Sequence, residues 1–277
     1  NGKFGIGLGG SGSIDTLTNT GQITSEIGSS GGDPIPGAAI FVGSNSSINT
    51  LDNSGTIETY DGSSVINSYG TINNLVNSGT IHSDEDSAVT GGIANITNTG
   101  TISADGWKAL GLGSGTLNNS GTISAGSSDA LSMQGDGIVT NSGTISAAGN
   151  SGIYISSGTG ATIINSGTIS AGGDYGLHNY AGTIATLTNT GTITANGNYG
   201  IFNERRTGGR GGDVEAYITT LNNSQGASSS ALDYNGRLPT NYNIIINSNS
   251  DYGKINVSST DLLGTTNFGI YSSSTID

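Results

Sequence analysis

The stretch Asn141-Ser142-Gly143-Thr144-Ile145 is one copy of a pentad, Asn-[Ser/Thr]-Gly-x-Ile, that the chain repeats eight times. The copies begin at Asn19, Asn53, Asn77, Asn98, Asn119, Asn141, Asn165 and Asn189, and most are 21 to 24 residues apart. A fixed period of this length indicates a solenoid, in which each turn buries its apolar side against its neighbours. The residues around the pentad alternate between apolar and polar, which favours strands over helices.

Three apolar columns emerge when the repeats are aligned. The first precedes the pentad Asn by two residues, and the second is the pentad Ile. The third lies further along each turn and consists of Ile40, Val65, Val89, Leu110, Leu131, Ile153, Leu177 and Ile201. Three short strands per turn predict an all-β fold, a three-faced parallel β-helix of about ten coils. At a strand spacing of about 4.8 Å the rod would be roughly 50 Å long, and the chirality of parallel crossovers predicts right-handed coils.

The pentad residues have structural explanations. We expect the Gly to supply a positive φ at a tight corner between two strands. The Asn falls at the same place on every turn, so its side-chain amides are predicted to stack into a hydrogen-bonded ladder along the axis. The β-branched residues that follow suit the start of the next strand.

The repeat also divides the chain into segments. We assign residues 1–226 to the β-helix repeats, with loop insertions at 28–39 and 204–216 that break the period. The segment Leu221–Gly226 is a degenerate ninth copy of the pentad region. We assign residues 227–277 to modified terminal coils or a cap, because a solenoid must protect its open edge.

Composition excludes several classes of function. The chain has no cysteine, so disulfide scaffolds, zinc-thiolate sites and cysteine nucleophiles are excluded. Its formal charge of −13 would repel a polyphosphate, so nucleic acid is not a predicted partner. The longest apolar run, Ala38 to Val42, is far shorter than a membrane span, and we predict no membrane insertion by this segment and no cofactor.

Two features resemble a known family. The repeated Asn-Ser-Gly-Thr-Ile pentad, and the stretch Leu238–Ser248 followed by Asp251-Tyr252-Gly253-Lys254, are similar to the passenger regions of Gram-negative autotransporters (type V secretion). The resemblance implies an extracellular β-helix on the bacterial cell surface. It also implies an export signal before the passenger and an outer-membrane β-barrel after it, so we expect a passenger segment of a longer precursor. Passengers include adhesins, self-associating proteins, toxins and hydrolases, so the function stays open.

A catalytic role has one candidate row. Glu58, His82 and Ser103 each follow a pentad Ile on adjacent turns, and together they have the composition of a nucleophilic triad. Flat parallel strands do not form the sharp turn that exposes a nucleophile. We therefore interpret the row as polar and solvent-facing, and we predict that the protein is not an enzyme.

Paired carboxylates offer a second chemistry. Asp84 and Asp105 each lie five residues after a pentad Gly, so their carboxyl groups could approach the roughly 5 Å separation of a retaining glycosidase. The same region, Asp84-Glu85-Asp86, is open to two other interpretations, a solvated acidic edge or a weak calcium site. We favour the acidic edge and predict no metal.

Binding residues are easier to recognise. An outward aromatic row is expected from residues that directly follow the third column, and a basic loop comes immediately after it. The candidate partner-binding residues are Tyr154, His178, Phe202, Arg205, Arg206 and Arg210. Aromatic side chains beside a basic loop could stack on sugar rings or engage another protein. Two alternatives stay open: the loop could pair with the acidic edge of another copy, or the stacked rings only stabilise the face of the sheet. Tyr175 and Tyr199 form a second aromatic pair, and Lys108 shares its register with Asp129.

The predicted function is that of a non-enzymatic cell-surface adhesin segment. It would mediate self-association or attachment through multivalent polar β-helix faces, with affinity growing with contact length. Its partner would be another copy of itself, a homo-oligomer or filament, or a surface glycan or protein receptor. The alternatives are a structural stalk or fibre subunit, and a polysaccharide-active β-helix enzyme.

Overall fold

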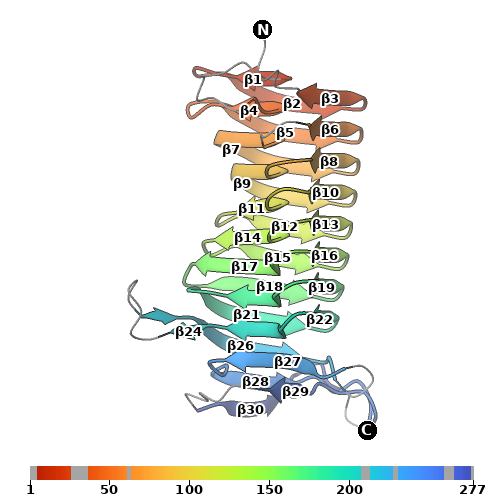
Figure 1. Cartoon of the computed structure of the whole chain (residues 1–277), viewed down its shortest axis with the longest axis vertical. Helices are drawn as coiled ribbons and strands as arrows, with labels where there is room; N and C mark the ends of the chain where they lie inside the picture. The colour runs from red at the N-terminus through yellow and green to blue at the C-terminus, as the bar shows by residue number, and fades with distance from the viewer. Residues whose placement is uncertain are drawn as a thin grey trace.

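The computed structural model describes residues 5–25, 37–60, 64–206, 213–226, 230–258 and 265–275. Short strands wind into a β-solenoid of about nine turns, which stack from the N-terminal to the C-terminal end of a rod (Figure 1). The predicted three-faced parallel β-helix is therefore confirmed, and the number of turns is close to the predicted ten. None of the described residues forms a helix with the length and apolar character needed to cross a bilayer.

Face one is the first of the three parallel sheets met along each turn. Its strands are β1 (Ile6–Leu8), β4 (Ile40–Val42), the first parts of β7 (Ile66–Asn77) and β9 (Val89–Asn98), β11 (Leu110–Leu112), β14 (Leu131–Gln134), β17 (Ser151–Ser157), β20 (Tyr175–Asn179), β23 (Tyr199–Asn203), β27 (Leu232–Gly236) and β29 (Ile255–Val257).

Face two follows across a corner, and β7 and β9 run through this corner without a break. Its strands are β2 (Ser13–Asn19), β5 (Ser47–Asn53), the second parts of β7 and β9, β12 (Thr116–Asn119), β15 (Ile138–Asn141), β18 (Ala161–Asn165), β21 (Thr183–Asn189), β26 (Tyr217–Asn223), β28 (Asn241–Ile244) and β30 (Asn267–Ile270).

Face three begins within each pentad and has eight strands in the described part of the chain. They are β3 (Gln22–Ser25), β6 (Thr56–Thr59), β8 (Thr80–Ser83), β10 (Thr101–Ala104), β13 (Thr122–Ala125), β16 (Thr144–Ala147), β19 (Thr168–Ala171) and β22 (Thr192–Ala195). Its last strand is β22, whereas faces one and two continue to β29 and β30.

The core is a narrow apolar stack along the axis. Within one turn Leu75, Ile81 and Val89 point inward, one from each face, and all three are fully buried. The third column differs from the prediction at one turn, because Ile66 and not Val65 pairs with Ile40 and Val89. Val65 is also buried, since it occupies the corner position that small residues fill in other turns, Ala39, Ala88, Ala109 and Ala130.

The structural reason for glycine in the pentad differs from the predicted one. The expectation of positive φ is wrong for them, because the described glycines with positive φ are Gly10, Gly91, Gly158 and Gly236. Gly143 is required by close approach instead. A Cβ added there would lie 2.1 Å from the carbonyl oxygen of Gly121 on the preceding turn, which no side chain could accommodate. From Gly55 to Gly191 the pentad corners stack too closely on the preceding turn for any side chain, whereas Gly21, in the first pentad, meets no atom within 4 Å.

The predicted asparagine ladder is confirmed. The Nδ2 group of Asn77 donates to Oδ1 of Asn98 at 2.8 Å and to the carbonyl oxygens of Gly79 and Thr101. The same side-chain contact links successive pentads from Asn19 to Asn189 and then reaches Asn223. Because these amides are almost fully buried, each rung satisfies donors and acceptors that water cannot reach.

The structure describes the two period-breaking insertions to different extents. Most of the insertion at 28–39 lies outside the described residues. The insertion at 204–216 carries a two-stranded antiparallel hairpin, β24 (Arg205–Arg206) with β25 (Val214–Glu215), and Figure 1 shows β24 projecting from the side of the rod. The segment assigned to terminal coils or a cap contains β27 to β30, which extend faces one and two in parallel.

Candidate binding surface

A group of aromatic side chains lies on the outside of face one, over β17, β20 and β23. We name this group the aromatic surface; its members are Tyr154, Tyr175, His178, Tyr180, Tyr199 and Phe202. The register aligns Tyr154 with His178 and His178 with Phe202 on successive turns, and it also aligns Tyr175 with Tyr199. Both outward rows expected from the sequence are therefore present, and their binding role stays a prediction.

The rings pack against one another along the axis. The ring centroids of Tyr154 and His178, and of His178 and Phe202, are 5.2 Å apart. Tyr175 lies 4.8 Å from both His178 and Phe202, and it stacks on Tyr199 at 6.4 Å. This packing leaves the rings half-buried rather than fully exposed, and it gives the surface a fixed shape.

The sequence interpretation missed Tyr180, which lies 6.0 Å from both Tyr154 and His178. The sequence does contain a signal for Tyr180. Side chains of a strand alternate between its two sides, so Tyr180, two residues after His178, is expected on the same outward side. Burial raises the pKa of the Tyr154 and Tyr175 hydroxyls above the usual range, so both remain neutral hydrogen-bond donors at physiological pH.

A buried polar contact holds the centre of the aromatic surface. Nε2 of His178 lies 2.8 Å from Oε2 of Glu204, and their side chains are only 15% and 12% exposed. Glu204 comes from the start of the insertion at 204–216. The imidazole is thereby fixed in its orientation, which aligns its ring between Tyr154 and Phe202.

An arginine of the predicted basic loop forms an ion pair with a glutamate of the same insertion. Arg205 lies 3.5 Å from Glu215 across the hairpin, and Arg237 lies 3.2 Å from the same carboxylate. The Tyr217 hydroxyl also donates to Glu215, and together with the two guanidinium groups it lowers the pKa of that carboxyl. Arg206 pairs through its backbone with Val214.

Arg210 lies outside the described residues. The structure therefore brings Tyr154, His178 and Phe202 together and places Arg205 in an ion pair of its own chain.

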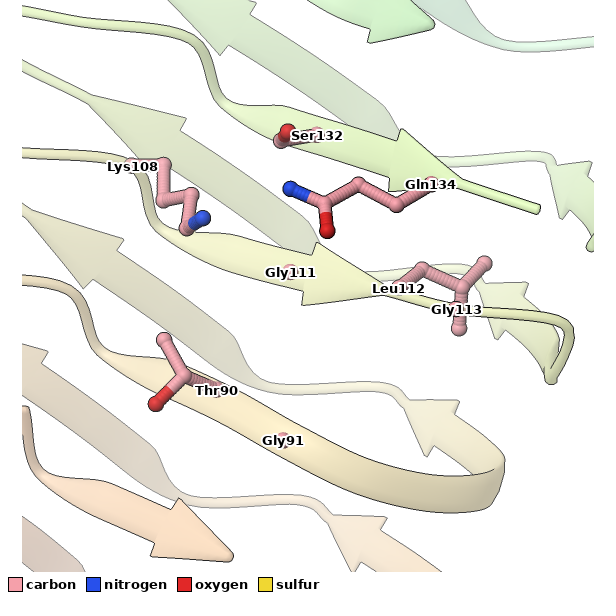
Figure 2. A pocket seen from close by; sticks show the side chains of 8 residues that line it. All are labelled: Thr90, Gly91, Lys108, Gly111, Leu112, Gly113, Ser132 and Gln134. Atoms are coloured by element: carbon pink, nitrogen blue, oxygen red, sulfur yellow. The ribbon is translucent and has the colours of Figure 1, made fainter. Parts of the chain in front are cut away.

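A groove opens on face one, on the N-terminal side of the aromatic surface. It has a volume of about 280 Å³ and is lined by Thr90, Gly91, Lys108, Gly111, Leu112, Gly113, Ser132 and Gln134. These residues come from β9, β11 and β14 and from the chain beside them, as Figure 2 shows. The sequence interpretation did not find this groove.

Three polar side chains of the groove have unused hydrogen-bonding groups. Within the part of the chain that the structure describes, the side chains of Thr90, Lys108 and Gln134 make no hydrogen bond. Figure 2 shows the polar end of Lys108 near the start of β11, and the side chain of Gln134 extending from β14 over the space between β14 and β11. Such convergent donors and acceptors are characteristic of a ligand-binding groove.

The row proposed as a triad on face three has its predicted register. Glu58 aligns with His82, and His82 aligns with Ser103. Nδ1 of His82 lies 2.8 Å from Oγ of Ser103, but Nε2 lies 2.8 Å from Oδ1 of Asp84. The acid beside the imidazole is thus Asp84, two residues along the same chain, and not Glu58.

The surroundings of Glu58 and Ser103, the two other residues of the row, lack parts that a catalytic triad needs. The carboxylate of Glu58 accepts hydrogen bonds from Gln22 and Tyr60 instead. Ser103 lies within β10, which pairs with β8 and β13 on either side, so the backbone amides of these strands serve the sheet. An oxyanion hole needs amide groups that the sheet does not use.

The acidic edge beside this row contains a group that could approach a cation. His82, Asp84 and Asp105 offer ligand atoms that all lie within 4.8 Å of one another. The two contacts of His82, to Ser103 and Asp84, account for its orientation without an ion. Asp105 is exposed to solvent, and the solvated acidic edge stays our prediction.

Neither protein-family models, curated protein sequences nor solved structures provide a match to this chain. The functional assignment therefore rests on the geometry of the molecule itself.

Proposed function

We propose that this chain is a non-enzymatic adhesin segment of the autotransporter passenger type, which works on the outside of a bacterial cell. The observation that carries the proposal is the aromatic surface on face one, because six rings from three successive turns form one rigid patch on the outside of the rod. A β-solenoid is compatible with a structural or adhesin-like role, and preformed aromatic patches are the anchors of many binding surfaces.

The physical basis of attachment is rigidity together with repetition. The rings already pack against one another, so binding a partner would cost little side-chain entropy. The hydroxyl groups of Tyr154, Tyr175, Tyr180 and Tyr199 add hydrogen-bonding groups at the rim of an otherwise apolar patch. The partner is a surface glycan or a protein receptor, and the charge of −13 disfavours nucleic acid.

Self-association of rods is the second candidate, and an exposed amide row on face two favours it. Nδ2 of Asn73 donates to Oδ1 of Asn49 at 3.2 Å, and Asn49 donates in turn to Asp15. Amides aligned in this way could continue their hydrogen bonds to a second rod, with affinity growing with the length of overlap. Self-association in which the arginines of the 204–216 insertion pair with the acidic edge of a second copy has less support, because Arg205 and Arg237 already share Glu215.

The test couples the chain to beads and measures two quantities, bead clumping and bead binding to surfaces coated with cell-surface glycans or proteins. Replacement of Tyr175 and Phe202 by Ser removes two packed rings, and we expect at least a tenfold loss of binding. The control is Tyr69→Ser, which removes a ring that is 65% exposed and lies outside the aromatic surface.

The outcomes separate the candidates. Clumping that survives the double Ser variant would assign self-association to another face, such as the Asn49 row. Beads that neither clump nor bind any coated surface would contradict the adhesin and leave a structural stalk. Far-UV circular dichroism of each variant verifies that the solenoid is intact.

A further inference from the structure

The groove and the aromatic surface are one continuous binding surface along face one. Ser132 lines the groove and pairs in register with Tyr154, the first ring of the aromatic surface. From β9 to β23 the outward row therefore changes from small and polar residues to rings without a gap. At about 4.8 Å between strands, this surface is elongated along the rod axis, which suits an extended polymer better than a compact ligand.

The groove exists because side chains are missing from its floor. Gly111 and Gly113 lie on adjacent outward positions of one turn. A Cβ added at Gly113 would meet no atom within 4 Å, whereas one at Gly111 would make ordinary contacts with the Lys108 side chain at 3.5 Å and the carbonyl oxygen of Val89 at 3.8 Å. The hollow is thus open space over an intact strand. Its volume of about 280 Å³ is near the lower end of small-molecule sites, so it matches a small unit such as a single sugar ring.

The groups around the groove match a ligand rich in hydroxyls. Lys108 supplies an ammonium donor, Gln134 supplies both a donor and an acceptor, and Thr90 supplies a hydroxyl that can do either. None of the three makes a hydrogen bond within the described part of the chain. A sugar ring in the groove could satisfy all of them, and rings that follow it could lie against Tyr154 and its neighbours.

The charge around the groove selects a neutral ligand. Lys108 interacts electrostatically with Asp129, its neighbour on the next turn, so an anionic ligand in the groove would also meet this carboxylate. The rest of the chain is strongly acidic, with 20 acidic residues against 7 basic ones. An anionic polymer would be repelled along most of the rod, whereas a neutral one would not.

We infer that face one binds a neutral polysaccharide, with one sugar ring in the groove at Gly111 and the following rings along the aromatic surface. This inference rests on the proposed attachment function and names the class of its partner. The order of the two parts of the binding surface along the rod follows from the strand register. The groove lies on the N-terminal side of Tyr154, and the packed rings lie on its C-terminal side.

The experiment measures the binding of the whole chain to soluble polysaccharides by isothermal titration calorimetry. The neutral probes are dextran, mannan and laminarin, and the anionic probe is alginate. We expect at least one neutral probe to bind and alginate to bind at least tenfold more weakly. Gly113→Leu fills the groove, and Lys108→Ala removes its ammonium group; each should weaken the bound neutral probe at least fivefold.

Gly21→Leu is the matched control, because a Cβ at Gly21 also meets no atom within 4 Å but lies at a corner of face three, far along the rod from the groove. It should leave affinity unchanged. Three results would overturn the inference: no neutral probe binds, alginate binds best, or Gly113→Leu binds as tightly as the unchanged chain. If attachment in the bead assay persists in any of these cases, the proposed function stands and only the glycan assignment fails.

Discussion

The side-chain amide of Gln225 hydrogen-bonds to both backbone groups of Ile193. Its Oε1 accepts from the N–H of Ile193 at 2.8 Å, and its Nε2 donates to the carbonyl oxygen of the same residue at 3.2 Å. Ile193 lies on β22, the last strand of face three. One buried side chain thus satisfies two backbone groups on the edge of β22 that no strand of the described residues covers.

Gln225→Ala should open this edge. Because two buried backbone groups lose their partner, we expect a fall of about 1–3 kcal/mol in the free energy of unfolding. The Ile193 amide should also exchange its hydrogen at least tenfold faster, as measured by hydrogen exchange. Gln22→Ala, at the opposite end of face three and exposed to solvent, should change neither quantity. Unchanged exchange at Ile193 would show that Gln225 does not protect the edge.

A break in the middle of the asparagine ladder should destabilise the rod more than a break at its end. Asn141 accepts from Asn119 and donates to Asn165, so Asn141→Ala removes one of the hydrogen bonds of the Asn119 Nδ2 group and leaves Oδ1 of Asn165 without its donor. We expect a loss of about 2–3 kcal/mol in the free energy of unfolding, measured with urea.

Asn19→Ala is the comparison for this effect. Asn19 is the first rung and has a partner only on its C-terminal side along the ladder. Its loss should be less than half that of Asn141→Ala, because no described asparagine precedes Asn19 in the ladder and its Oδ1 accepts only from the Gly21 N–H of its own turn. Equal losses at the two positions would mean that the ladder does not act as a continuous structure.

Much of the fold could be predicted from the sequence because the repeat is periodic. The pentad sets the period, and the three columns set the number of faces, so the register of Tyr154 with His178 follows directly. The same reasoning could not explain the pentad glycines. A repeated Gly shows that a side chain is not tolerated, but only the stacked corners show that the obstacle is the carbonyl oxygen of the preceding turn at Gly143.

The candidate site was only partly visible in the sequence. The groove depends on side chains that are absent, at Gly111 and Gly113, together with residues from neighbouring turns. The chain has 49 Gly, so the sequence does not distinguish these two glycines from the others. The groove could therefore be recognised only in the structure. The contact of His82 with Asp84 also needs the structure to be seen, because strand register aligns residues of adjacent turns and does not consider Asp84, two residues along the same chain.

Removal of an unpaired buried hydroxyl should not destabilise the protein. Ser68 is 3% exposed, and its Oγ has no hydrogen-bond partner. Ser68→Ala should therefore raise the free energy of unfolding by up to about 1 kcal/mol or leave it unchanged. Ser83 is equally buried, but its Oγ accepts from the backbone N–H of Asp86. Ser83→Ala should be destabilising, and a loss at Ser68 as large as that at Ser83 would contradict the prediction.

Asp129 should make the rod less stable at neutral pH than at acidic pH. Burial raises the pKa of its carboxyl, although the hydrogen bond from Ser151 and the charges of His178 and Lys108 partly oppose the rise. The folded protein therefore binds a proton at Asp129 more readily than the unfolded chain does. The penalty for its negative charge is fully present above the raised pKa and disappears as the pH falls toward the value of an unfolded Asp, about 3.9.

Asp129→Asn keeps an acceptor for the Ser151 amide and removes the charge, so the variant should be more stable than the unchanged chain at pH 7. This advantage should shrink as the pH falls to about 4, measured by urea unfolding across the range. Asp136→Asn provides a control of opposite sign, because hydrogen bonds from Thr159 and Gly160 lower the pKa of that carboxyl. It should destabilise at pH 7 and lose its effect at acidic pH. If both variants shift stability in the same direction, local burial does not control the titration of Asp129.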